Sequence, residues 1–424
     1  MSGTDWVVYR FCLCLVAGML AAAPGRDPRP QAATDPGAPG PCEVSSRTVQ
    51  VDGDLETHVY YPQDDRCGNS ITAPYPGIGF AHGFSMFGLT NGAADNAGTG
   101  EHLASWGYVV AIPVLPDDFE SRITDLQAVL SYLEAQTDTP ASFLYRKVDT
   151  GRLAVTGHSL GGATALALAA RDSRVKAVAA LDPVYHQGGP GGNPALWDPA
   201  LEGPHVAVPT CILGAPPSNC NSEGDHARIY PFVGAAHKTS FLVVAASHCD
   251  FMNPGQPLCT LVCTGDTDPQ RTRLIQKTMT AWFNYYLHLN TDAYTYLYGA
   301  HAQTDIDSGR IERQVDTAPK GLTTVGMTDA IALGWERYEH PIVAGYNIYR
   351  RLPGETYAET PQAQVGPTST YLDAGLQPGQ TYSYTLRSRD SAGNLHQPSG
   401  EVSAVPTGSV TCMSVYLPII LRTR

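Results

Sequence analysis

The motif Gly157-His158-Ser159-Leu160-Gly161 is the part of this sequence that carries the clearest chemistry. It follows the apolar run Leu153–Thr156 and precedes a helix-forming run that begins at Ala163. A G-x-S-x-G motif between a strand and a helix is typical of a nucleophile elbow, a tight turn that exposes a serine hydroxyl above a sheet. The glycines are needed because this turn brings backbone so close to its neighbours that a Cβ does not fit. We therefore predict that Ser159 is a nucleophile.

A serine hydroxyl is a weak nucleophile, so a base must activate it. An apolar run over residues 241–247 ends at His248, which places an imidazole at the carboxyl end of a predicted strand. Ligands of open α/β sheets bind at this edge. His226 and His237 are alternatives, but they lie in a helix-like segment where we expect solvated side chains, and His158 cannot turn back to serve its neighbour. We predict His248 as the general base.

The carboxylate that would orient this base has two candidates. Asp182 directly follows the apolar run Val178–Leu181, 23 residues after the serine. A carboxylate at that strand end can reach the imidazole and stabilise its protonated form, although an Asp-Pro turn is also an ordinary structural feature. Asp225 is the alternative acid, and Asp250 is expected to support the site from behind the base. We predict Asp182 as the acid.

Two backbone N–H groups are expected to stabilise the oxyanion that forms when a serine attacks a carbonyl group. The apolar run Gly77–Ala81 ends in His82-Gly83, and the loop after such a strand is one source of these donors. We predict the N–H of Phe84 as the first donor and the N–H of Leu160, the residue after the nucleophile, as the second. His82 is expected to hold loop backbone and to take no part in the reaction.

The elements that must position these residues alternate between strand and helix patterns from residue 46 to about 300. This alternation predicts an α/β fold with a mostly parallel sheet covered by helices on both faces. Residues 318–406 change to short alternating strands separated by turns, which predict an all-β sandwich. The predicted organisation is a signal peptide (1–23), a Pro/Gly-rich linker (24–45), a catalytic domain (46–300), a linker (301–316), a β domain (317–407) and a tail (408–424).

Composition restricts the partners and the compartment. The 424 residues carry a formal net charge of −13, which disfavours binding to nucleic acid because that requires a clustered basic face. Arg10 and the short apolar run Phe11–Ala23 indicate a secretory signal peptide, and no later stretch is long enough to span a membrane. The eight cysteines that follow fit an exported, disulfide-bonded chain. We expect a Cys42–Cys67 bond and a pairing among Cys220, Cys259 and Cys263, and we expect neither a metal nor a cofactor.

Residues 46–300 resemble α/β-hydrolase esterases of the bacterial cutinase and polyester-hydrolase group. The resemblance is carried by residues 148–162, which end in the serine motif, and by Met279–Phe283. Those enzymes have an aspartate where this chain has Ser218, and no acid at position 182. Asp182 followed by proline is more similar to chlorophyllases, and platelet-activating-factor acetylhydrolases likewise place the acid one strand early. The resemblance implies Ser159, Asp182 and His248 as a catalytic triad.

The second domain resembles fibronectin type III modules. Its matching features are Trp335, Tyr346–Tyr349, Thr370–Leu376, Tyr382–Tyr384 and Asp390–Asn394. In exported enzymes such a module implies a spacer or a docking unit. Taken together, these features predict a secreted serine esterase acting on small acyl esters, lipids or polyesters. The alternatives are a non-catalytic surface-binding or adhesion protein with a relic hydrolase fold, and a serine peptidase of the same fold.

Overall fold

The computed structural model describes residues 35–68, 71–85, 91–186, 196–338 and 340–408. The predicted signal peptide and nearly all of the predicted tail lie outside these ranges. None of the helices in the described part of the chain combines the length and the hydropathy that a membrane crossing requires.

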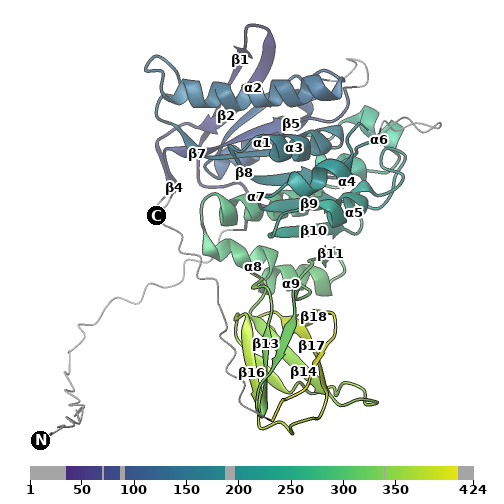
Figure 1. The fold of residues 1–424 in the computed structure, drawn as a ribbon. Coiled ribbons are helices and arrows are strands. Elements are labelled where there is room, and N and C mark those ends of the chain that lie inside the picture. The colour runs from purple at the N-terminus through teal and green to yellow at the C-terminus, as the bar shows by residue number, and fades with distance from the viewer. Residues whose placement is uncertain (1–34, 69–70, 86–90, 187–195, 339, 409–424) are drawn as a thin grey trace, which may run out of the picture. The chain divides into compact units, whose positions relative to one another are not determined.

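A sheet of nine strands forms the centre of the first domain (Figure 1), in the order β1-β2-β6-β5-β7-β8-β9-β10-β11. The strands from β6 to β10 in this order run parallel, whereas β1, β2 and β11 are joined to it by antiparallel pairing. Strand β5 is buried along its whole length because helices cover both faces of the parallel region. The bounds are β1 Val44–Val51, β2 Leu55–Pro62, β5 Tyr75–Ala81, β6 Val109–Pro113, β7 Val148–His158, β8 Val175–Leu181, β9 Thr210–Gly214, β10 Lys238–Val243 and β11 Ile311–Gln314. A separate short hairpin pairs β3 Arg66–Cys67 with β4 Ile71–Thr72.

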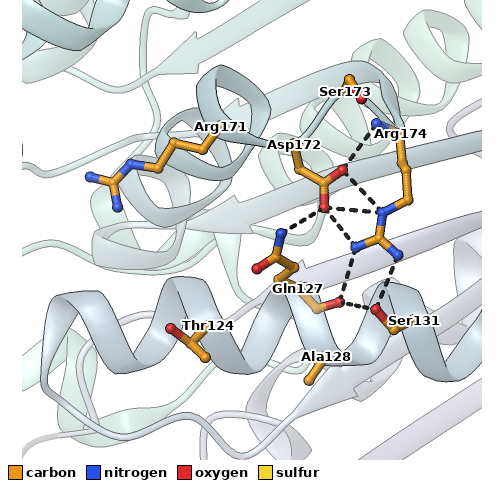
Figure 2. Close-up of a pocket in the computed structure, with 8 residues that line it drawn as sticks. All are labelled: Thr124, Gln127, Ala128, Ser131, Arg171, Asp172, Ser173 and Arg174. Atoms are coloured by element: carbon orange, nitrogen blue, oxygen red, sulfur yellow. Dashed lines mark hydrogen bonds and ion pairs between the residues drawn. The ribbon is translucent and has the colours of Figure 1, made fainter.

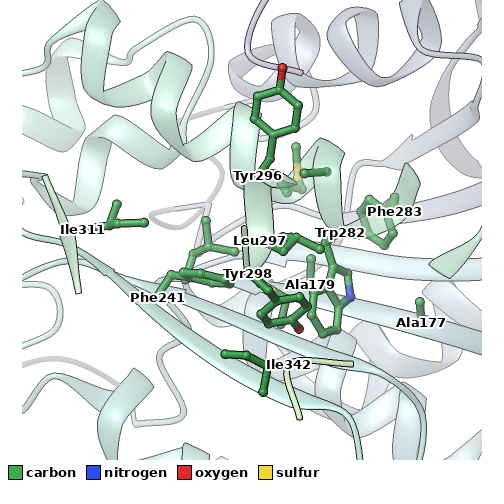
Figure 3. Close-up of a cluster of buried hydrophobic side chains, with 14 of the residues drawn as sticks. Ala177, Ala179, Phe241, Trp282, Phe283, Tyr296, Leu297, Tyr298, Ile311 and Ile342 are labelled. Atoms are coloured by element: carbon green, nitrogen blue, oxygen red, sulfur yellow. The ribbon is translucent and has the colours of Figure 1, made fainter. Parts of the chain in front are cut away.

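Two pairs of helices cover this sheet. Helices α2 (Phe119–Thr137) and α3 (Leu160–Arg171) pack together over β5 and β7, and α1 (Ala97–Ser105) and α7 (Pro269–Tyr286) pack together against other strands. Asp118 begins α2 by accepting a hydrogen bond from the backbone of Ser121, and Asp268 begins α7 in the same way. Figure 3 shows the apolar core beneath α7, where Trp282 and Phe283 lie near alanines of β8. The α/β fold predicted from the sequence is confirmed.

Shorter helices fill the connections between strands and helices. They are α4 Pro199–Glu202, α5 Asp225–Ile229, α6 Pro257–Cys263, α8 Tyr294–Leu297 and α9 Ala300–Asp307, with 3-10 turns at Ala94–Asn96, Gly203–His205, Tyr230–Phe232, His248–Phe251 and Thr291–Ala293.

Both predicted linkers, 24–45 and 301–316, contain regular or hydrogen-bonded structure within their described residues. Residues 301–316 include most of α9 and the edge strand β11, which pairs with β10. In the 24–45 segment, the N–H of Gly40 donates to the hydroxyl of Ser105 at 2.8 Å, and β1 begins at Val44. Short polar edge strands such as β11 have little hydrophobic period, which is why composition alone suggests a linker.

The C-terminal region is an all-β sandwich of two antiparallel sheets, as predicted. One sheet contains β12 Thr323–Gly326, β13 Ala330–Gly334 and β16 Thr370–Ala374; the other contains β14 Gly345–Arg351, β15 Ala363–Val365, β17 Tyr382–Arg389, β18 Leu395–Pro398 and β19 Val402–Ala404. Its core holds Trp335 and Tyr346, whose ring centroids lie 5.4 Å apart in an edge-on contact. These aromatic residues therefore serve packing, as their alternation in sequence indicates.

Three disulfide bonds join described cysteines. The expected Cys42–Cys67 bond is confirmed. Cys220 pairs with Cys263, one of its two expected partners, whereas Cys259 bonds Cys249, the residue after the predicted base. Cys211 is a free, buried thiol in β9, so the even number of cysteines does not mean that every one is paired.

Candidate active site

Ser159 lies at the sharp turn between β7 and α3, where the sequence motif places it. Its φ of 58° and ψ of −124° are strained for a residue with a side chain. The two motif glycines make this turn possible, because a Cβ on Gly157 or Gly161 would overlap the carbonyl oxygen of Ala81. The serine side chain is partly exposed, while its backbone is held by bonds to β8 and to the segment after it, including the N–H of Val184 at 3.0 Å. Ser159 therefore has the strand–turn–helix geometry that a nucleophile elbow requires.

Asp182 and His248 are brought together from different strand ends. The carboxylate Oδ2 of Asp182 accepts a hydrogen bond from Nδ1 of His248 at 2.6 Å, and both side chains are buried. The other oxygen, Oδ1, accepts the N–H of Ala215 at 3.1 Å and the amide of Asn221 at 3.0 Å. Asp182 has a φ of 39°, so the loop that follows β8 bends sharply to aim this side chain. Three donors thus hold the carboxylate and fix which of its oxygens faces the imidazole.

The turn that carries His248 is held by Asp250. This 3-10 turn begins at Ser247, whose N–H donates to Oδ2 of Asp250 at 2.7 Å. Arg271 of α7 donates to the same oxygen at 2.7 Å, and the N–H of Asp268 donates to Oδ1 at 2.7 Å. The Cys249–Cys259 disulfide adds a covalent link to the same turn. The structure therefore gives Asp250 the supporting position that the sequence analysis expects.

His158 contacts the predicted base, His248, from within the turn of the serine motif. Its Nε2 donates to the backbone carbonyl of His248 at 3.0 Å, and the two ring centroids lie 4.5 Å apart. Because a carbonyl oxygen can only accept, the proton of the His158 ring lies on Nε2. Burial, together with the nearby His248 ring, lowers the pKa of His158 well below its usual value, so this ring is neutral. It therefore holds the turn of His248 through the backbone carbonyl of that residue.

Asp225, the alternative acid, belongs to a different pair. Its Oδ2 accepts from Nδ1 of His186 at 3.3 Å and from the N–H of Tyr185 at 3.2 Å. Burial raises the pKa of Asp225. Asn221 connects the two carboxylates, since its amide donates to Asp182 while its carbonyl oxygen accepts the N–H of Asp225 at 2.9 Å. His226 was expected to be solvated, but it is buried, because its ring packs against Gly214 of β9.

The two predicted oxyanion donors lie on either side of the elbow. Leu160 is the first residue of α3, so its N–H is at a helix N-terminus, where backbone N–H groups lack intrahelical partners. Phe84 follows β5 in an exposed loop whose next residue, Ser85, is anchored to Asp117 by bonds of 2.8 and 3.0 Å. Gly83 lies close to Ser159, because a Cβ added to Gly83 would be 3.2 Å from Cβ of Ser159. This arrangement is suited to binding an oxygen that develops negative charge.

Three described cysteines lie close enough together to suggest a metal site, but they cannot act as ligands. The sulfur atoms of Cys249, Cys259 and Cys263 lie within 4.8 Å of one another, but all three are in disulfides and offer no thiolate.

Figure 2 shows a surface pocket between α2 and the carboxyl end of α3. The 12 residues of α3 separate this end from Ser159 by about 18 Å. Its charged groups are paired, with Arg174 bound to Asp172 at 2.7 Å and to Glu134 at 2.5 Å. We assign this pocket no part in the chemistry.

Two supporting residues have no sequence motif that identifies them. Asn221 lies in an irregular segment of polar residues, and nothing in its surroundings distinguishes it before the fold brings it to Asp182. Arg122 is fully buried beneath the loop of Phe84, and no motif in the sequence indicates this burial.

Comparison with known proteins places this site in a family. The model of the PET hydrolase-like family matches residues 20–310, more than half of the chain. The chain is 30% identical over 215 residues to a cutinase of Thermobifida fusca, with 47% of this chain and 62% of that protein covered. It is 31% identical to the cutinase est1 of Thermobifida alba (45% and 57% covered) and 29% identical to a bis(hydroxyethyl) terephthalate hydrolase of Streptomyces coelicolor (45% and 54% covered), each over 196 residues. These matches span less than two thirds of each relative's length. With the family model covering residues 20–310, the chain belongs to the PET hydrolase-like family.

Proposed function

We propose that this chain is a serine carboxylic-ester hydrolase with Ser159 as nucleophile, His248 as general base and Asp182 as the acid that orients it. The observation that carries the proposal is the 2.6 Å hydrogen bond between Nδ1 of His248 and Oδ2 of Asp182, together with the strained elbow at Ser159. Family membership and the cutinase relatives support ester hydrolysis as the reaction.

The hydrogen bond decides how His248 acts. An ionised carboxylate only accepts, so the proton of neutral His248 lies on Nδ1 and the lone pair lies on Nε2. Nε2 takes the hydroxyl proton of Ser159 as its Oγ attacks the ester carbonyl carbon. The negative oxygen of the tetrahedral intermediate is stabilised by the N–H groups of Phe84 and Leu160, and Asp182 stabilises the imidazolium.

The intermediate then collapses to an acyl-enzyme. Protonated His248 gives its proton to the leaving alcohol oxygen as the ester C–O bond breaks. A water molecule next attacks the acyl carbon while Nε2 of His248 removes its proton, and collapse of the second intermediate returns that proton to Ser159. The products are a carboxylic acid and an alcohol, and no cofactor is needed.

Replacement of Ser159 by Ala tests this function. We expect kcat for p-nitrophenyl butyrate to fall by about 10⁶-fold, because the nucleophile is lost, with no loss of folding by circular dichroism. Ser131→Ala, an exposed hydroxyl on α2, is the matched control and should retain full activity. A fluorophosphonate probe should label the unchanged protein and not the Ser159 variant. Unlabelled wild-type protein would favour the alternative of a non-catalytic surface-binding protein.

The names of the relatives support a proposal for the substrate class. Their names describe cutinases and a hydrolase of bis(hydroxyethyl) terephthalate, and we propose small acyl esters, lipids or polyesters for this chain. A panel of short and long acyl esters, a polyester film, a chlorophyll-type ester and a peptide amide would separate these substrates, and would also test the alternative of a serine peptidase.

The remaining parts of the chain fit an exported enzyme. The predicted signal peptide and the three disulfides support export, because such bonds persist in oxidising compartments. We propose that the C-terminal sandwich is a fibronectin type III-like module that serves as a spacer or a docking unit. Comparing the full chain with one ending at residue 316 for adsorption to a polyester film would separate these two roles.

A further inference from the structure

The peptide bond between Gly83 and Phe84 is held by its carbonyl oxygen. This peptide carries the N–H of Phe84 that the proposed function assigns to the oxyanion. In a trans peptide the carbonyl and the N–H point in opposite directions, so donors that hold one also aim the other. Nδ1 of His82 lies 2.6 Å from the carbonyl oxygen of Gly83, and Nη2 of Arg122 donates to the same oxygen at 3.5 Å.

The proton position on His82 is settled by its second contact. The backbone N–H of Leu115 donates to Nε2 of His82 at 2.8 Å, so Nε2 must accept and Nδ1 must carry the proton. The ring is packed directly against Gly92, where a Cβ would overlap it. Burial lowers the pKa of His82 to about 3, so the ring stays neutral and keeps donating to Gly83.

Arg122 reaches both sides of the proposed oxyanion site. Its guanidinium is fully buried and donates through Nη2 to the carbonyl of His82 and through Nη1 to the carbonyl of Pro116, the latter at 2.7 Å. On the other side, Nε donates to the hydroxyl of Thr164 at 3.3 Å, and that hydroxyl donates to the carbonyl of Leu160 at 2.9 Å. One side chain therefore joins the loop of Phe84 to the first turn of α3.

The charge of Arg122 matters as much as its geometry. Burial lowers the pKa of this arginine to about 10, which leaves it positively charged at neutral pH. A cation on the carbonyl side of a peptide polarises it and strengthens its N–H as a donor. Asp117 and Asp125 are the nearby opposite charges, and Asp117 is itself bonded to Ser85 of the same loop.

We propose that Arg122 is a positioning residue for the reaction: with His82 it fixes the Gly83–Phe84 peptide and ties it to the turn of Leu160, so that both N–H groups bind the oxyanion. This inference rests on the proposed function. Arg122 touches no reacting atom, and its effect is transmitted through backbone.

Arg174 provides a matched control for the test. Both arginines form contacts between α2 and the α3 region. Arg174 pairs with Glu134 of α2, and Figure 2 shows its bond to Asp172, which follows the end of α3 farthest from Ser159. Arg122→Gln, Arg122→Lys and Arg174→Gln would be compared in the full chain. The measurements are kcat and KM for p-nitrophenyl butyrate at 25 °C, the Ki of an alkylboronic acid, whose tetrahedral adduct with the serine mimics the intermediate, and the melting temperature.

We expect Arg122→Gln to lower kcat at least tenfold with KM within threefold of wild type, and to weaken boronic acid binding by a similar factor, because the lost interaction is made with the oxyanion. Arg122→Lys, which keeps the charge, should fall between this variant and wild type. Arg174→Gln should leave kcat and Ki unchanged.

Two outcomes would overturn the inference. One is a lower melting temperature for both Arg122 variants with wild-type kcat and Ki, which is the result of a purely structural role. The other is an equal loss of kcat in Arg174→Gln, which would trace the effect to general loosening of α2 and α3. If Arg122→Gln does not fold, Arg122→Lys is judged by the same criteria. Failure of the unchanged protein to hydrolyse the ester would instead overturn the proposed function.

Discussion

Replacement of Asp182 by Asn makes the sharpest test of the proposed triad, because the structure dictates how the new amide must sit. Asn221 and the N–H of Ala215 both donate to Oδ1 of Asp182. An asparagine at this position must therefore keep its carbonyl oxygen there, since the reverse orientation would place its NH₂ group against two donors. Its NH₂ group then faces Nδ1 of His248, where the wild-type protein has a carboxylate oxygen at 2.6 Å.

This orientation inverts the tautomer of the base. Nδ1 of His248 must now accept a hydrogen bond, so the ring proton moves to Nε2 and the lone pair needed to deprotonate Ser159 is lost. We expect kcat to fall by about 10⁴-fold, the size of effect that a wrong tautomer has in a Ser-His-Asp triad. This corresponds to about 5.5 kcal/mol of activation free energy. The fold should persist, because the hydrogen bonds at Oδ1 are retained.

Asp225→Asn is the matched control for this prediction. Asp225 contacts His186 and not His248, and its bonds of 3.2 and 3.3 Å are long, so we expect less than a tenfold loss of kcat. Initial rates with p-nitrophenyl butyrate at pH 8, with circular dichroism to verify folding, measure both variants. The assignment of the acid would be refuted if kcat fell less than tenfold in Asp182→Asn, or if it fell more in Asp225→Asn than in Asp182→Asn.

Two further predictions concern stability and the turn of the base. The folded pKa of His82 is lowered to about 3 from 6.5, so the unfolded chain binds a proton that the fold excludes, and this residue alone should lower the free energy of unfolding by about 1.4 kcal/mol per pH unit as pH drops from 6.5 toward 4. Burial also lowers the pKa of His102, His288 and His340, which adds to the same trend. Urea unfolding at pH 7, 6 and 5 would test this, and a flat profile would contradict it. Removing the Cys249–Cys259 bond by double Ser replacement should lower the free energy of unfolding by about 3 kcal/mol and also lower kcat, because the bond holds the turn of His248. Removing the Cys42–Cys67 bond should lower stability alone, and equal losses of kcat in the two variants would contradict this connection to His248.

The residues at strand ends were the most predictable part of the site. Each of Ser159, Asp182 and His248 follows an apolar run, and the carboxyl ends of parallel strands meet at one edge of a sheet. The structure brings Asp182 and His248 into contact as this reasoning expects. The fold class is predictable for the same reason, since buried parallel strands read as continuous apolar runs.

The supporting residues could not be predicted because their roles depend on contacts distant in sequence. Arginines on helices are usually solvated, and the burial of Arg122 depends on its contact with Gly83, which lies 39 positions earlier in the chain. Asn221 is one polar residue among several in an irregular segment. Strand β11 was missed because its residues, Ile-Glu-Arg-Gln, have one buried position and a polar edge.

The proposed position of the acid at Asp182 accounts for the contacts made by its neighbours. Strand β8 lies between β7, which carries the nucleophile, and β9, so a carboxylate at the end of β8 is close to both loops. The segment after β9 then needs no acid, and it supplies donors instead: the N–H of Ala215 and the amide of Asn221 both bind Asp182. The carboxylate that this segment does contain, Asp225, is occupied by His186. With the proposed acid at the end of β8, the segment after β9 thus supplies a clamp of donors for the carboxylate instead of the carboxylate itself.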